Sequence, residues 1–229
     1  ADMACESFRD FLKQLEGEGE LRRISAPVAT ELEITEVADR EMKKPGGGQA
    51  LLFEQPIVNG NPSPFPLAIN TYGSEKRMAM VLGRATVEDA AAELNKLVKA
   101  KPPTTFGETF KLLGTALDLR HAKPKKVKIG PCKEVVRRFD DKSPSTPNPQ
   151  LSTLLNFPIQ QCWPQDAGRF LTLPCVVTHD PDTDDRNLGL YRMQVFDDRT
   201  TALHWQLQKV AARHGISGGG TSPGKELGL

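Results

Sequence analysis

Residues 162–208 read CWPQDAGRFLTLPCVVTHDPDTDDRNLGLYRMQVFDDRTTALHWQLQ. Apolar and β-branched runs alternate there with aspartate-rich turns at Asp180-Pro181-Asp182-Thr183 and Asp197-Asp198-Arg199. This pattern predicts three successive β-strands joined as an antiparallel meander. The middle and last strands carry polar side chains where the interior of a barrel needs apolar ones. The stretch therefore decides the fold and also directs the search for a functional site.

The polar side chains follow the two-residue period of a strand. In the middle strand, residues 188–196, one face has Leu188, Leu190, Arg192, Gln194 and Phe196, and the other has Gly189, Tyr191, Met193 and Val195. In the last strand, one face has Thr200, Ala202, His204, Gln206 and Gln208, and the other has Thr201, Leu203, Trp205 and Leu207. Antiparallel pairing can bring the two polar rows side by side. An unpartnered buried polar group costs about 1–3 kcal/mol, so the rows face water or a polar ligand, and periodicity alone leaves both open.

The charge balance excludes some classes of partner. The 229 residues include 30 Lys and Arg against 29 Asp and Glu, a net charge of +1, which argues against nucleic acid or an anionic membrane as the main partner. The basic run at residues 123–128, KPKKVK, is interpreted as a solvated linker. Apolar runs are too short to span a bilayer, and the first residues lack the features of a secretory signal. We therefore expect no transmembrane segment and a cytoplasmic location.

Two groups of potential metal ligands favour structural interpretations. The four cysteines, Cys5, Cys132, Cys162 and Cys175, lack CxxC spacing, so we expect reduced packing residues rather than a zinc site or disulfides. A second group combines His179 with Asp180, Asp182, Asp184 and Asp185. It lacks the central glycine and final glutamate of an EF-hand loop, so a polar hairpin turn is favoured over a metal site.

The first 120 residues alternate helix and strand, as in a small α/β domain. Helices are predicted from a Ser7 cap to Gly17, from about Thr30 to Pro45, from a Thr86 cap to Val98, and over residues 105–119; strands are predicted at 50–53 and 66–69. Gly46-Gly47-Gly48 follows a helix and precedes a strand, the reverse of the order in phosphate-binding loops, so it is interpreted as a turn.

Several motifs together resemble the UbiD family of prenylated-FMN-dependent decarboxylases, of the 4-hydroxybenzoate or polyprenyl-hydroxybenzoate carboxy-lyase type. The motifs are FRDFLKQLEGEGELRRI, ELEITEVADR, ALLFEQP, INTYGSEKRMAMVLG, GPCKEVV, CWPQDAGRFLTLP, RNLGLYRMQVFDDRTT and HWQ, within residues 6–214. The implied fold is α+β. It comprises an α/β domain (1–122), a linker (123–150), part of an antiparallel, flavin-binding split β-barrel (151–214) and a flexible tail (215–229).

The resemblance also implies a reaction and a set of partners. The reaction is the reversible, non-oxidative decarboxylation of an aromatic or α,β-unsaturated acid, in quinone biosynthesis or aromatic acid metabolism. The cofactor is prenylated FMN, supplied by a flavin prenyltransferase, with Mn2+ or Mg2+ and with K+ as a further candidate ion. A homo-oligomer is expected.

The implied site residues lie in the predicted barrel. Asn187 is the implied metal ligand, and Arg192 the implied catalytic residue beside the substrate carboxylate. The implied cofactor-binding residues are Thr172, Asn187, Gly189, Leu190, Tyr191, Arg192, His204, Gln206 and Gln208. Gln208 stands where some family members have a metal-binding histidine, which leaves the second metal ligand open.

In the family the proton donor, further glutamates and a glutamate metal ligand come from later sequence. We therefore expect this chain to be truncated and inactive alone. Two other classes remain open: a non-catalytic interaction or cofactor-handling module, because a meander leaves strand edges exposed, and an FMN split-barrel oxidoreductase.

Overall fold

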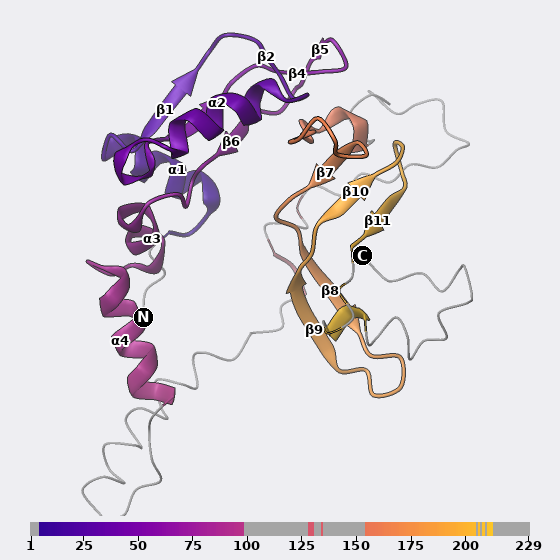
Figure 1. Cartoon of the computed structure of the whole chain (residues 1–229). Helices are drawn as coiled ribbons and strands as arrows, with labels where there is room; N and C mark the ends of the chain where they lie inside the picture. The colour runs from indigo at the N-terminus through magenta and orange to yellow at the C-terminus, as the bar shows by residue number, and fades with distance from the viewer. Residues whose placement is uncertain are drawn as a thin grey trace, which may run out of the picture.

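The computed structural model describes residues 5–98, 128–130, 134, 154–204, 206, 208 and 210–212. They form an N-terminal region, residues 5–98, and a β-rich region, residues 154–212, drawn in indigo to magenta and in orange to yellow in Figure 1. The predicted helix at 105–119 and the predicted tail lie outside the described residues. So does the predicted linker, apart from four of its residues.

The N-terminal region alternates helices and short strands. Its helices are α1 (Phe8–Gly17), α2 (Glu33–Met42), the 3-10 turn η1 (Pro45–Gly47), α3 (Glu75–Leu82) and α4 (Val87–Val98). Its strands are β1 (Leu21–Ile24), β2 (Val28–Ala29), β3 (Ala50–Phe53), β4 (Pro56–Val58), β5 (Asn61–Pro62) and β6 (Leu67–Ile69). The strands form two sheets, in the orders β1-β3-β6 and β2-β4-β5.

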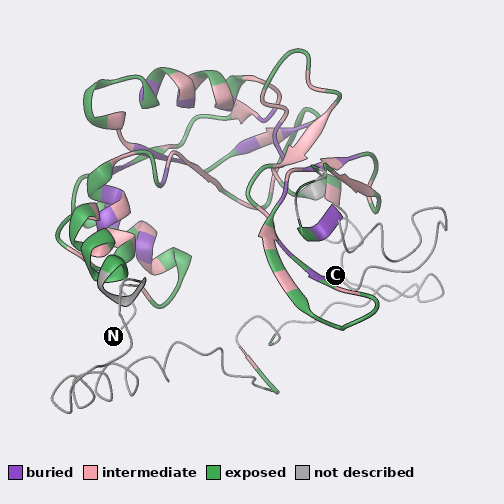
Figure 2. Ribbon diagram, turned by 60° about the horizontal axis from the view of Figure 1, so that its bottom comes forward, coloured by how far each residue is buried: buried purple, intermediate pink, exposed green. Residues whose placement is uncertain are grey.

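Strand β3 is the centre of the N-terminal core, because all four of its residues are buried. It pairs in parallel with β1 and antiparallel with β6. Helix α1 packs on the face with Ala50 and Leu52, and Ile34 of α2 packs on the face with Leu51 and Phe53. In α1 and α2 the buried residues lie on one side and the exposed residues on the other (Figure 2). A strand covered on both faces explains the continuous apolar sequence of β3.

Side-chain caps set two of the helix starts as predicted. Ser7 accepts a hydrogen bond from the Asp10 backbone N–H, and Thr86 accepts one from the Asp89 N–H. The predicted start of α2 at Thr30 is wrong by three residues. Thr30 is fully buried and bonds the Ile57 carbonyl through both its backbone N–H and its hydroxyl, so it joins β2 to β4 instead of starting the helix.

The glycine run before β3 is a turn, as predicted. Gly47 has a φ of +83°, and a Cβ there would lie 1.9 Å from the carbonyl oxygen of Gly73. The fully buried Arg77 donates hydrogen bonds to the carbonyls of Gly47 and Gly48 and to Glu20. This turn is therefore a structural element fixed by an arginine.

The described residues of the β-rich region form five strands and a 3-10 turn, η5 (Leu154–Asn156). The strands are β7 (Arg169–Leu171), β8 (Cys175–His179), β9 (Arg186–Leu190), β10 (Met193–Val195) and β11 (Thr201–Leu203). They form two antiparallel sheets, β11-β10-β7 and β8-β9. The two predicted hairpin turns are confirmed, because Asp180 and Asp197 each accept backbone N–H bonds through their side chains. These two sheets do not confirm the predicted split β-barrel.

Two predicted strands have different limits. The strand predicted over residues 188–196 breaks at Tyr191-Arg192, where pairing changes from β8 to β7 and β11. The last strand was predicted to reach Gln208 but ends at Leu203. The predicted faces survive the break, because Tyr191, Met193 and Val195 are buried while Leu190 is exposed. Alternation continues across a break when the backbone stays extended.

Polar contacts connect the two regions. The Leu32 backbone N–H donates to the Gln161 carbonyl, and the Gln161 N–H donates to the Thr30 carbonyl. Arg169 of β7 forms an ion pair with Glu31 and donates to the side chain of Asn59. These bonds set the start of the β-rich region beside the N-terminal sheet β2-β4-β5.

Candidate functional site

The polar row of β10 binds a loop of the same region. This loop, residues 162–168, is called the Cys162–Gly168 loop below. Arg192 donates to both carboxylate oxygens of Asp166, at 3.2 and 2.8 Å, and Gln194 donates to the Ala167 carbonyl at 3.1 Å. Arg192 and Gln194 are therefore half-buried under a loop of the protein. The two alternatives considered from the sequence were that they face water or a polar ligand.

The Arg192 guanidinium is held from a second direction by an aromatic ring. Its carbon lies 3.8 Å from the ring centroid of Phe170 in β7, within the range of a cation–π contact. Its side chain stays 37% exposed, while that of Asp166 is 12% exposed. The hydrogen bonds from Arg192 lower the pKa of the Asp166 carboxyl, and those to Asp166 raise the pKa of Arg192. Arg192 is thus a fixed, permanently charged fork that solvent can still reach.

Three of the predicted site residues meet on the opposite, inner face of β9. Asn187 donates through its amide nitrogen to the Thr178 hydroxyl at 3.2 Å and to the Tyr191 hydroxyl at 3.3 Å. The Tyr191 hydroxyl also accepts from the Ala211 backbone N–H. The Tyr191 ring lies over Gly189, where a Cβ would approach it to 2.4 Å. Tyr191 therefore packs in the core of the β-rich region, and Gly189 is required by its ring.

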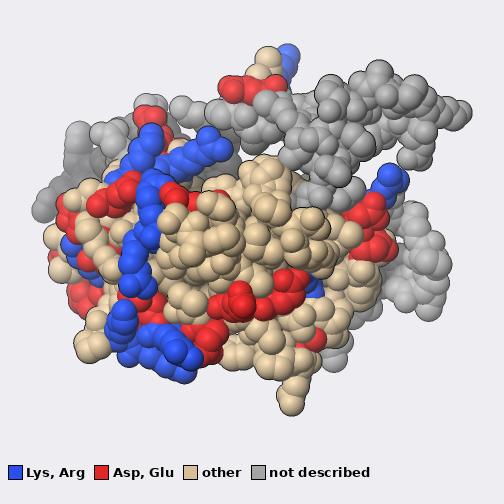
Figure 3. Space-filling view, turned by 90° about the horizontal axis from the view of Figure 1, so that it is seen from above, with Lys and Arg blue, Asp and Glu red and all other residues tan. Residues whose placement is uncertain are grey.

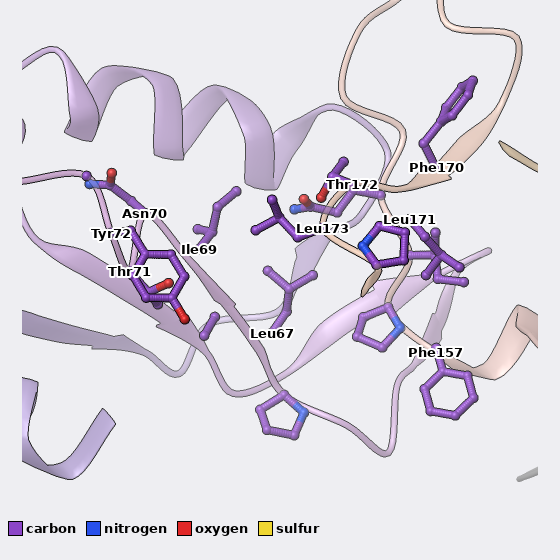
Figure 4. A pocket seen from close by; sticks show the side chains of 17 residues that line it. Leu67, Ile69, Asn70, Thr71, Tyr72, Phe157, Phe170, Leu171, Thr172 and Leu173 are labelled. Carbon is purple, nitrogen blue, oxygen red and sulfur yellow. The ribbon is translucent and has the colours of Figure 1, made fainter. Parts of the chain in front are cut away.

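Thr172 lies in a different place, at a cavity between the two regions. The cavity measures about 730 Å3 and is lined mainly by apolar residues. Figure 4 shows Tyr72 and Ile69 toward one end, Phe157 and Phe170 toward the other, and Leu67 and Leu173 between them. Phe170 thus lines the cavity and also contacts the Arg192 guanidinium through its ring. The size is that of a ligand pocket.

The remaining predicted residues are exposed. Leu190 faces solvent on the outer side of β9. His204 follows β11 and donates its backbone N–H to the Arg192 carbonyl, which confirms the predicted pairing of the rows at this one position. Gln206 and Gln208 lie beyond the strand and hydrogen-bond each other at 3.2 Å. The structure therefore brings Arg192 beside His204, but it places Asn187 on the other face.

The sequence analysis did not predict that Asp166 and Phe170 contact Arg192. Asp166 stands in a turn, Cys162-Trp163-Pro164-Gln165-Asp166, whose residues were interpreted as part of a family motif without assigned roles. The turn offered a signal, because aspartate commonly bonds nearby backbone N–H groups in turns. Its pairing with an arginine 26 residues away depends on the sheet.

Two of the predicted residues, at separate places, have chemistry that a flavin and a hard cation would use. Thr172 is a hydroxyl at the edge of a cavity of suitable size, and the Asn187 amide oxygen is a ligand type that Mn2+ or Mg2+ accepts. Within the described part of the chain, no group of three or more His, Cys, Asp and Glu residues could hold a metal ion. Asn187 would thus supply one ligand, and other residues the rest.

Charge on the surface is mixed. Figure 3 shows blue and red side chains interspersed over one face, next to a broad uncharged area. Arg23, for example, forms partly exposed ion pairs with Glu16 and Glu54. Among the described residues, no helix combines the length and the hydropathy that a membrane span needs.

Two models of one family match the chain. The 3-octaprenyl-4-hydroxybenzoate carboxy-lyase N-terminal domain matches residues 12–100, and the UbiD carboxy-lyase Rift-related domain matches residues 125–217. This chain belongs to the UbiD family. Uncharacterized proteins of Aquifex aeolicus and Archaeoglobus fulgidus are 44% and 42% identical to it, over 90% and 93% of the chain. The matches cover 39% and 40% of those proteins, so the chain spans about two-fifths of their length.

Solved structures share the fold. The closed form of vanillic acid decarboxylase from Sedimentibacter hydroxybenzoicus aligns with a TM-score of 0.65 and 25% identity, over 90% of this chain and 38% of that one. The UbiD-class enzyme HmfF from Pelotomaculum thermopropionicum, in complex with FMN, aligns with a TM-score of 0.63 and 21% identity, over 90% and 38%. The mixed α and β fold predicted from the sequence is therefore confirmed.

Proposed function

We propose that this chain forms the N-terminal and cofactor-binding parts of a carboxy-lyase that decarboxylates an aromatic or α,β-unsaturated acid reversibly and without oxidation. The observation that carries the proposal is Arg192, a half-exposed guanidinium fixed by Asp166 and Phe170 in a chain of the UbiD family. A guanidinium offers two parallel N–H donors to a carboxylate, which suits an acid substrate.

Prenylated FMN, when bound, would accept the electrons that departing CO2 leaves behind. Thr172 and His204 would contact its ring system, and Asn187 would bind the cation at its phosphate. Leu190 and Asn187 lie on opposite faces of β9 in this structure, so both would reach the cofactor only after a rearrangement. Gln206 and Gln208 would lie nearby, with Gln208 as a second, weaker oxygen ligand. Gly189 and Tyr191 would support this surface from the inner face, where the Tyr191 hydroxyl orients the Asn187 amide.

Arg192 would bind and orient the substrate carboxylate. Its charge is retained at every physiological pH, so it would keep the acid ionised before the reaction. Phe170 would limit access of water to one side of the guanidinium. The proton that replaces CO2 would come from residues that the aligned two-fifths of the relatives do not include.

The test is exchange of 13C-labelled bicarbonate into the carboxyl group of vanillate or 4-hydroxybenzoate. The assay uses the Aquifex aeolicus relative with its aligned segment replaced by this chain, produced beside a flavin prenyltransferase. We expect exchange in the chimera and its loss in the Arg192→Met variant of that chimera. The intact relative is the control: exchange in it but not in the chimera would contradict the proposal.

A non-catalytic interaction module is a second candidate, because large apolar side chains are exposed on the hairpin β8-β9. Val177, Leu188 and Leu190 are 38%, 63% and 56% exposed, and Val177 pairs with Leu188 across the two strands. Gel filtration tests the module: a monomer argues against it, and an oligomer that Leu188→Lys dissociates would show that this hairpin is an interface.

A further inference from the structure

A carboxylate of the protein occupies the fork that an acid ligand would need. Both oxygens of Asp166 accept from Arg192, one from each terminal nitrogen of the guanidinium. This two-point geometry is the one that a substrate carboxylate would adopt. A ligand acid and Asp166 therefore compete for the same donors.

Asp166 is held in place by its own loop. Its backbone N–H donates to the Trp163 carbonyl at 3.1 Å, and its Oδ2 accepts the Trp163 N–H at 3.2 Å. Gln161 adds a bond from its amide to the Asp166 carbonyl at 3.3 Å. With only 12% of its side chain exposed, Asp166 is an ordered part of the loop rather than one half of a chance surface pair.

We propose that Asp166 is a positioning and specificity-determining residue, which holds the Arg192 fork and yields it to the carboxylate of an acid ligand but not to a neutral ligand. The identity of the ligand rests on the function proposed above. Phe170 keeps the guanidinium in position during the exchange, because its ring contact does not use the N–H donors. A neutral ligand of the same shape has no group that can replace Asp166.

If a ligand carboxylate replaces Asp166 at Arg192, removal of the Asp166 charge should have opposite effects on ligand binding and on the order of the Arg192 side chain. Without the Asp166 charge, Arg192 loses its internal partner, so an acid ligand binds more tightly. The guanidinium also loses an anchor, so its side chain becomes more mobile. A purely structural role for Asp166 would instead weaken binding together with order.

The experiment follows the Arg192 Nε–H signal by NMR in the whole 229-residue chain. Vanillate is titrated against guaiacol, which is the same ring without the carboxylate. We expect vanillate to shift the signal and guaiacol to leave it in place. Asp166→Asn should tighten vanillate binding about 2–5-fold, the range that a partly exposed ion pair supports, without changing guaiacol binding.

Two variants complete the test. Asp166→Glu keeps the charge and should restore most of the wild-type vanillate affinity. Asp198→Asn removes the carboxylate of an exposed pair with Arg199 and should change nothing. Weaker or unchanged vanillate binding in Asp166→Asn would overturn the proposal, as would an equal response to guaiacol. If Asp166→Asn does not fold, a wild-type Arg192 signal that ignores vanillate is itself the contrary result.

Failure of the proposed function gives a different pattern. The chimera could show no 13C exchange while the Arg192 signal still distinguishes vanillate from guaiacol. That result would reject the proposed decarboxylase function and retain the proposed replacement of Asp166 by a ligand carboxylate at Arg192.

Discussion

Two arginines that bind a carboxylate, one in each region of this protein, have different consequences. Arg77 in the N-terminal region is fully buried and bonds Glu20 and two glycine carbonyls. Arg192 in the β-rich region bonds Asp166 but stays 37% exposed. The first arginine completes a turn in a closed core, and the second remains available to a ligand. The comparison teaches that burial, rather than residue type, separates a structural arginine from a candidate binding arginine.

The largest expected effect is on Arg77. Arg77→Met removes three hydrogen bonds that a fully buried charged group donates, to Glu20 and to the carbonyls of Gly47 and Gly48, which we expect to reduce the free energy of unfolding by about 3–5 kcal/mol. Arg40→Met is the control, because Arg40 forms an exposed pair with Glu36; it should cost less than about 1 kcal/mol. Chemical denaturation measures both, and equal losses would remove the distinction between the two kinds of arginine.

Substitution of one leucine in each region tests whether burial separates the two regions in the same way. Leu51 in β3 is fully buried, and Leu188 in β9 is 63% exposed. Leu51→Ala should reduce the free energy of unfolding by about 2–5 kcal/mol, since it leaves a cavity. Leu188→Ala should change it by less than about 0.5 kcal/mol. Thermal unfolding checks the pair, and a large loss at Leu188 would mean that another surface covers this hairpin in solution.

Two glycine substitutions should change stability by smaller amounts, with opposite signs. Gly189→Ala forces a Cβ to within 2.4 Å of the Tyr191 ring and should destabilise the protein by about 1–3 kcal/mol. Gly17→Ala meets nothing within 4 Å, in the last turn of α1, and should be neutral or stabilise by up to about 1 kcal/mol. Unfolding midpoints in urea measure both. The account of Gly189 fails if both variants are neutral.

The smallest effect is a dependence on pH. The hydrogen bond from Lys44, followed by that from the Gln49 backbone N–H, lowers the pKa of Glu41 in the folded protein. A lowered carboxyl pKa adds stability above the unfolded value of about 4.3, and this stability is lost as the pH falls through the folded value. Glu41→Gln should therefore flatten the decline in unfolding midpoint between about pH 5 and 3, and exposed Glu36→Gln should not. A decline that is equally steep in Glu41→Gln would contradict this cause.

Local signals in the sequence predicted part of the N-terminal region, but not helix α3 or strands β1, β2, β4 and β5. The Ser7 and Thr86 caps, the glycine turn and the apolar run of β3 each depend on neighbouring residues, and all are found. The start of α2 was misplaced because Thr30 bonds Ile57, 27 residues away. Tertiary contacts of this kind leave no local trace.

The candidate site could be predicted only in part for the same reason. The two-residue period correctly separated the buried face of Tyr191 and Met193 from the face of Arg192. It could not show that the Cys162–Gly168 loop covers Arg192, because that depends on how β7 pairs with β10. The roles of Asn187, Thr172 and the other implied cofactor residues stay predictions.

A crystal structure of this chain with vanillate tests the central claim most directly. The account predicts the vanillate carboxylate within hydrogen-bonding distance of the Arg192 guanidinium, with the Arg192–Asp166 bonds lengthened or broken and the Phe170 contact retained. Vanillate bound elsewhere at saturation, with Arg192 still paired to Asp166 as in the ligand-free protein, would contradict it.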